Sequence, residues 1–127
     1  MSELPEFSFA ARARSFRYAG RGIAALLRSQ HNAWIHAAGS VAVVGLGFAV
    51  GLSRLEWCLV VLAMVAVWSA EAVNTAIEAL CDVASPEVHP LVERAKDIAA
   101  GAVLMAAVGA AVVGLLVFGP HLLRRGW

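Results

Sequence analysis

The chain has 127 residues, of which 61% are hydrophobic and 15% are charged, and its mean hydropathy is +0.76. Soluble domains average about 45 to 50% apolar and about 25% charged residues, so this composition excludes a disordered chain and an ordinary soluble domain. Ten lysines and arginines nearly balance nine aspartates and glutamates, so no bulk charge favours nucleic-acid binding. We therefore predict one all-α membrane domain over residues 1–127, with its apolar excess facing lipid.

The N-terminal segment, about residues 7–29, mixes basic and apolar side chains. The basic residues recur at a helical spacing, at Arg14, Arg17, Arg21 and Arg28. A helix here has one basic face, while aromatic and aliphatic groups lie on the other. We predict an amphipathic helix lying in the membrane interface. A basic tail that only sets the topology is the simpler alternative.

Three apolar stretches follow, at about residues 34–52, 57–82 and 97–118. Each is long enough to span a bilayer as a helix, which takes about 20 residues. Seven lysines and arginines lie in the N-terminal arm and the connection at 85–97, against three in the first connection and the C-terminal tail. The positive-inside rule therefore predicts a multi-pass membrane protein whose N-terminus is cytoplasmic.

Small residues recur at intervals of four in two of the spans. Gly47 and Gly51 form one such pair, and Ala102, Ala106 and Ala110 form a second row. Such rows allow close helix packing in lipid, which favours a homo-oligomer. The alternative is chance, because alanine-rich segments often produce this spacing.

The second span carries a row of polar side chains, called here the polar row: Glu71, Asn74, Glu78 and Asp82. At about 100° per residue they share an arc of roughly 80°, and at about 1.5 Å per residue they extend over roughly 16 Å. Ionisable groups near the bilayer centre cost about 2.5 to 3.5 kcal/mol each, so these should face protein or a wet cavity. A deep carboxylate can act as a general base while the outer groups hold hydrated Mg²⁺. A neutral buried Glu71 and a merely solvated Asp82 are the structural alternatives.

Lys96 and Asp97 open the third span, and the second connection is expected to place them near Asp82. A lysine at this position often serves as a topological anchor, but it is also a point charge suited to a phosphoryl group. The sequence contains neither a P-loop nor a kinase-type glycine-rich loop. Any phosphate site must therefore use the carboxylates, a metal ion and the lysine.

Four segments together resemble the small bacterial diacylglycerol kinase and undecaprenol kinase family: SFRYAGRGI (15–23), QHNAWIH (30–36), EAVNTAIEALCD (71–82) and KDIAAGAV (96–103). The resemblance covers about residues 12–118. It implies an integral membrane kinase that transfers the γ-phosphoryl group of ATP to a lipid hydroxyl, working as a homotrimer with shared active sites. The second and fourth segments look more like the undecaprenol kinase branch, so undecaprenol is expected in preference to diacylglycerol.

The resemblance also implies roles for individual residues. Glu71 would bind the lipid and act as the catalytic base, and Glu78 would hold Mg²⁺ together with Gln30. The nucleotide contacts would be Tyr18, Gln30, Asn74, Glu78, Asp82, Glu87, His89, Lys96 and Asp97. Better-known members carry glutamate where this chain has Gln30, and many carry arginine where it has Trp34. The amide retains a carbonyl oxygen but lacks the negative charge, so weaker metal binding is expected.

Two other classes of function fit the spans. In a small oligomeric channel or proton-coupled transporter, Glu71 and Glu78 would line a path through the bundle. That function needs polar groups on both sides of Glu71, whereas Ser69 is the only polar side chain between Trp57 and Ala70 that extends the row outward. A scaffold subunit would explain the spans but not four polar groups on one arc.

Overall fold

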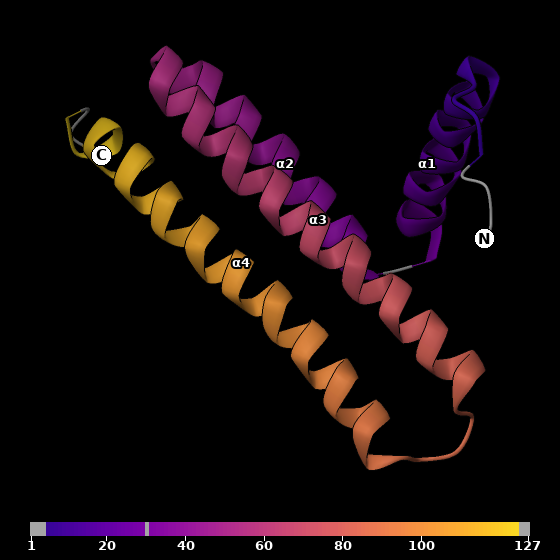
Figure 1. Ribbon diagram of the computed structural model, residues 1–127. Coiled ribbons are helices and arrows are strands. Elements are labelled where there is room, and N and C mark those ends of the chain that lie inside the picture. Colours follow the sequence, from indigo (N-terminus) through magenta and orange to yellow (C-terminus); the bar gives the residue numbers. More distant parts are fainter. Residues whose placement is uncertain (1–4, 30, 125–127) are drawn as a thin grey trace.

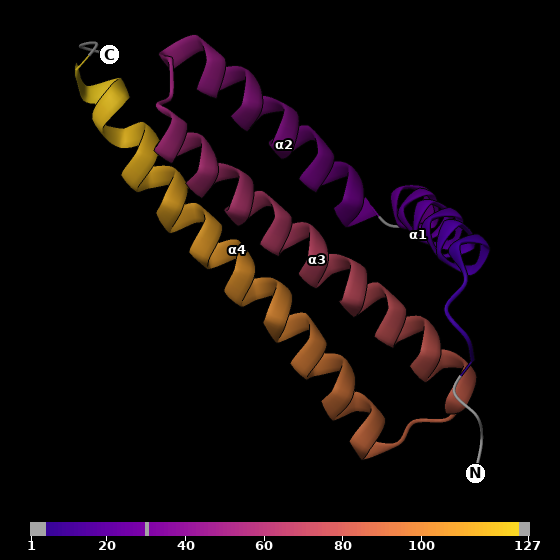
Figure 2. The same cartoon turned by 45° about the horizontal axis from the view of Figure 1, so that its top comes forward.

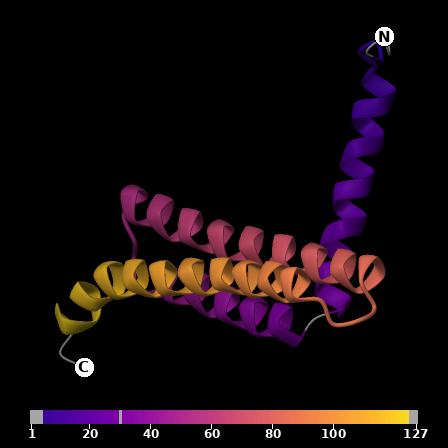
Figure 3. The same cartoon turned by 60° about the horizontal axis from the view of Figure 1, so that its bottom comes forward.

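The computed structural model describes residues 5–29 and 31–124, and all regular structure in these ranges is helical. The helices are α1 (Phe9–Ser29), α2 (His31–Val50), α3 (Arg54–Ala84) and α4 (Pro90–Arg124). Figure 1 and Figure 2 show α2, α3 and α4 running side by side, and Figure 3 shows α1 leaving them at a steep angle. The last three helices are long and apolar enough to cross a membrane. The predicted all-α class and its three apolar helices are confirmed.

The packed core lies at the end of the bundle that holds the α2–α3 turn, called here the turn end. Its buried members are Val50, Leu52, Val60, Val117 and Phe118. α3 packs against α4 far more extensively than any other pair of helices does. Other large apolar side chains of the three helices are exposed, including Phe48 and Leu116. Such a surface is suited to lipid or to other membrane helices rather than to water.

Local sequence signals fix the turn between α2 and α3. Gly51 has a positive φ of 73°, and the backbone N–H of Leu52 donates to the carbonyl oxygen of Gly47 over 3.1 Å. This is the hydrogen bond of a Schellman helix end, which favours glycine. Ser53 then caps α3 in a capping box with Glu56, whose backbone N–H donates to the Ser53 hydroxyl over 3.1 Å.

The opposite end of the bundle, called here the polar end, holds the connection between α3 and α4. This connection is shorter than the expected polar stretch at 85–97, because α4 already begins at Pro90. Proline suits the first helical position, where its missing N–H is not needed, and Glu93 follows in the first turn. Lys96 and Asp97 therefore do not open the helix as predicted; they lie nearly two turns inside it.

The two glycines of the predicted close-packing pair have different roles in the structure. Gly51 ends α2, as described above. Gly47 is buried, and a Cβ atom there would lie 2.6 Å from the Cη2 atom of Trp57. The Trp57 ring in turn packs against Phe48, with ring centroids 4.9 Å apart. Within one chain, Gly47 thus makes room for an aromatic side chain from α3.

Replacing Gly47 by alanine should therefore destabilise the protein, because the Trp57 ring must shift to admit the new methyl group. Overpacking of this kind costs about 1 to 3 kcal/mol. The control is Gly45→Ala, since a Cβ at Gly45 meets nothing within 4 Å and alanine is favoured over glycine in a helix. Thermal unfolding in detergent should give a lower midpoint for Gly47→Ala alone. Equal midpoints for both variants would contradict this packing role.

Candidate functional site

Glu71 is the deepest residue of the polar row. It is 2% exposed and is the only buried charged side chain in the described part of the chain. Its Oε2 atom lies 3.6 Å from Nε2 of His36, which comes from α2. The His36 side chain is 23% exposed, so it connects the buried carboxyl to more open space. A carboxyl group placed here has an imidazole as its neighbour rather than water.

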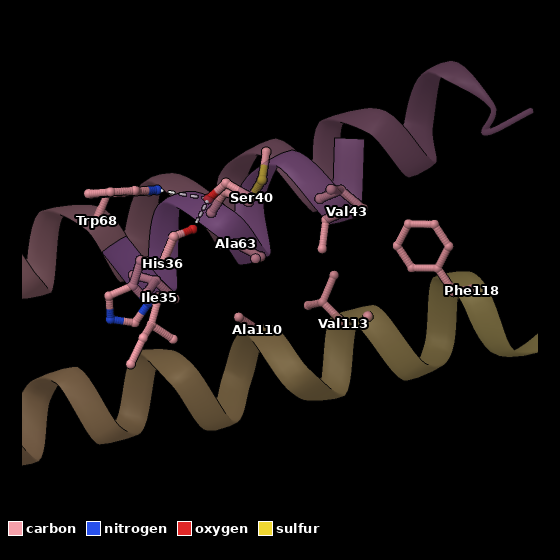
Figure 4. Close-up of a pocket in the computed structure, with 14 residues that line it drawn as sticks. Ile35, His36, Ser40, Val43, Ala63, Trp68, Ala110, Val113 and Phe118 are labelled. Carbon is pink, nitrogen blue, oxygen red and sulfur yellow. Dashed lines mark hydrogen bonds between the residues drawn. The ribbon is translucent and has the colours of Figure 1, made fainter. Parts of the chain in front are cut away.

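The surroundings of His36 are ordered by two hydrogen bonds, drawn as dashed lines in Figure 4. The Trp68 indole N–H donates to the Ser40 hydroxyl over 3.0 Å, and this hydroxyl donates to the His36 carbonyl oxygen over 2.7 Å. The Trp68 and His36 rings also meet edge to face, with centroids 6.0 Å apart. Together these contacts hold the first part of α2 against α3 beside Glu71.

His36 lines an open, mainly apolar groove of about 330 Å³ between α2, α3 and α4, shown in Figure 4. The groove runs toward the turn end, where Val113 and Phe118 line it. This volume is within the range of ligand sites, and apolar lining with few polar groups is typical of such sites.

Asn74 and Glu78 lie about one and two turns further along α3, and the amide nitrogen of Asn74 donates to Oε1 of Glu78 over 3.5 Å. The other amide atom, Asn74 Oδ1, is buried without a hydrogen-bond partner, as is the Thr75 hydroxyl. Buried polar atoms without partners often mark a site for an ion or water. An available amide oxygen beside a carboxylate fits Mg²⁺, which binds oxygen and takes few protein carboxylates. No cluster of three or more histidine, cysteine, aspartate or glutamate side chains suited to a metal occurs within residues 5–29 and 31–124.

Asp82 ends the polar row and pairs with α4. Its Oδ1 atom accepts a hydrogen bond of 2.7 Å from Nζ of Lys96. Both groups line an open polar pocket of about 730 Å³ at the polar end of the bundle. Glu87, His89 and Asp97 line the same pocket. The expected approach of the lysine to Asp82 is therefore present, and the α3–α4 connection contributes to the same pocket.

Two predicted site residues are not joined to this arrangement. Tyr18 is 61% exposed on α1, and its ring lies beside the Arg21 guanidinium of the same helix, 5.9 Å from the centroid. Gln30 lies outside the described residues. The sequence pattern does not predict His36, although it is within the segment QHNAWIH. It meets Glu71 only because α2 packs on α3, so no periodicity within one helix reveals the pair.

The described site thus extends along α3 between two chemically different spaces. Near Glu71 is an apolar groove, which suits a greasy substrate, and beyond Asp82 is a polar pocket with a lysine, which suits phosphates. Between them lie Asn74 and Glu78, which offer oxygen ligands. Such a row can bring a charged and an apolar reactant together.

Comparisons with known proteins agree with a site that brings a charged and an apolar reactant together. The family model described as prokaryotic diacylglycerol kinase matches residues 17–118. An undecaprenol kinase of Bacillus subtilis (strain 168) is 45% identical over 109 residues, covering 86% of this chain and 89% of that protein. A diacylglycerol kinase of Synechocystis sp. (strain ATCC 27184 / PCC 6803 / Kazusa) is 37% identical over 110 residues, covering 86% of this chain and 63% of that protein.

Proposed function

Because this chain belongs to the prokaryotic diacylglycerol kinase family and is a membrane lipid kinase, we propose that ATP is its phosphoryl donor and undecaprenol its preferred acceptor. The observation that carries the proposal is the polar row. It runs from Glu71, whose partner His36 lines the apolar groove, to Asp82, which lines the polar pocket together with Lys96. Diacylglycerol is the second candidate acceptor, as a relative with that activity in its name also matches.

Glu71 is the proposed catalytic base. The lipid O–H bond breaks as its proton passes to the carboxylate. The alcohol oxygen bonds to the γ-phosphorus of ATP, while the bond from that phosphorus to the bridging oxygen of ADP breaks. Little covalent help from the protein is needed for such a transfer, because alignment and charge neutralisation supply most of the acceleration. The burial of Glu71 beside the apolar groove supports this role.

Binding of Mg²⁺ and of the nucleotide is assigned to the remaining polar groups. Glu78 would hold Mg²⁺ with help from Asn74, and the bound ion would neutralise charge on the transferred phosphoryl group. Gln30 would add a carbonyl oxygen. Lys96 would contact the nucleotide phosphates once the Asp82 hydrogen bond is exchanged for them. Asp97, Glu87 and His89 line the pocket proposed for the rest of the nucleotide, and Tyr18 would approach it from α1.

The proposed assembly is a homotrimer in the bacterial inner membrane with active sites shared between chains. The broad exposed apolar faces of α2, α3 and α4 leave room for such packing. The N-terminus and the polar end would face the cytoplasm, where ATP is present, by the positive-inside count. α1 would lie in the interface, with its arginines toward the headgroups.

A channel or proton-coupled transporter is not favoured. The groove beyond Glu71 toward the turn end is lined mainly by apolar side chains, including Val60, Met64 and Phe118. Such a lining provides no continuous path for protons or ions in the described bundle. The matched relatives are named as kinases.

The test is a transfer assay with [γ-³²P]ATP and Mg²⁺ in mixed micelles, in which undecaprenol and diacylglycerol are compared at equal mole fractions. We expect labelled lipid phosphate from both, with kcat/KM at least about tenfold higher for undecaprenol, a difference of about 1.4 kcal/mol in transition-state free energy. A higher value for diacylglycerol would reverse the assigned preference. If neither lipid is labelled, the proposed function is wrong.

A further inference from the structure

His36 is the only side chain of the described residues that pairs with Glu71. A buried carboxylate without a partner is costly, because burial removes the water that stabilises its charge. The groups that line the groove around His36 include no second acid or base: α4 contributes Ala110, Val113, Gly114 and Phe118. On α3 itself, the next carboxylate of the polar row is Glu78, two turns away and bonded to Asn74. Glu71 therefore depends on one imidazole.

No water molecule can lie between the His36 imidazole and the Glu71 carboxylate. The separation of 3.6 Å between Nε2 and Oε2 is too short for an intervening water and only slightly longer than a direct hydrogen bond. Catalytic hydrogen bonds are often long before substrate binds and shorten in the reactive complex. The backbone of His36 is fixed by the Ser40 hydroxyl, and its ring lies against Trp68. The imidazole is thus held where it can orient one oxygen of the carboxylate and leave the other free.

We propose that His36 is the positioning residue of the catalytic base: its Nε2–H donates to Oε2 of Glu71 and directs the second oxygen of this carboxylate toward the lipid hydroxyl. The inference rests on the proposed function. His36 lines the groove proposed for the lipid, and the role assigned to it is exerted through Glu71 rather than on the reacting atoms. A histidine can fill this role since its ring nitrogen donates in both the neutral and the charged form.

The experiment compares three substitutions of His36 in the full-length protein. His36→Leu removes the donor but keeps an apolar side chain of similar bulk, and should lower kcat by about 10²-fold with little change in KM for ATP. His36→Gln keeps an N–H at a similar reach and should recover kcat to within about tenfold of wild type. His36→Asn is too short to reach the carboxylate and should behave like the leucine variant. The ranking Gln above Asn and Leu is not expected from a packing role.

The matched control is His121→Leu, which removes another imidazole–carboxylate pair. His121 Nε2 lies 2.6 Å from Oε2 of Glu56 at the turn end, away from the polar row. This variant should keep the kcat of wild type. If wild type shows no lipid kinase activity, the proposed function fails. If wild type is active and all three His36 variants match it in kcat, only the role of His36 is overturned.

Discussion

Replacing Glu71 by glutamine is expected to lower kcat for lipid phosphorylation by about 10³-fold, within the range typical of a lost general base. The amide has nearly the same shape as the carboxylate but cannot accept the proton of the lipid hydroxyl. Because Glu71 is buried and contacts neither Lys96 nor Asp82 in the described structure, KM for ATP should change little. Initial rates with [γ-³²P]ATP at saturating lipid measure the effect.

Glu56→Gln is the matched control for this loss. Like Glu71, Glu56 is a carboxylate paired with a histidine, but it is only partly buried and caps α3 at the turn end. Its replacement should lower the thermal unfolding midpoint and leave kcat near the wild-type value. An active Glu71→Gln enzyme with an unchanged oligomer in detergent would remove Glu71 from the role of base. Another group would then have to accept the proton.

Replacing Glu78 by glutamine is expected to have the second large effect, which is on the Mg²⁺ dependence of the reaction rate. Glutamine keeps one carbonyl oxygen but removes the negative charge, and the ion uses only one or two protein carboxylates. We expect kcat/KM for ATP to fall by about 10²-fold or more, and the Mg²⁺ concentration for half-maximal rate to rise. The decrease should exceed the 10- to 100-fold loss typical of residues that only support a metal ligand.

Gln30→Glu tests the same site in the opposite direction. It restores the negative charge that better-known members of the family carry, so half-maximal rate should be reached at a lower Mg²⁺ concentration. Rates are measured against free Mg²⁺ at a fixed concentration of ATP for wild type and for each variant. Unchanged Mg²⁺ curves for both Glu78→Gln and Gln30→Glu would place the metal elsewhere.

Much of this protein was predictable because its signals are local. A stretch of about 20 apolar residues must form a helix in lipid, since backbone groups there can find partners only within the helix. The helical period alone places Glu71, Glu78 and Asp82 on one arc, whatever packs against them. The close pairing of Asn74 with Glu78 follows from the same spacing, as residues four apart are neighbours on a helix.

The other features of the site and the core depend on how the helices pack against one another. The sequence by itself determined the three apolar helices and the polar row, since both depend on periodicity within a continuous segment. The approach of Lys96 to Asp82 was predictable, because a short connection joins their helices. Only the tertiary structure placed His36 against Glu71, because this pair joins two helices whose mutual rotation is set by many contacts at once. The same holds for Gly47, whose missing side chain matters only because Trp57 of the next helix fills that space.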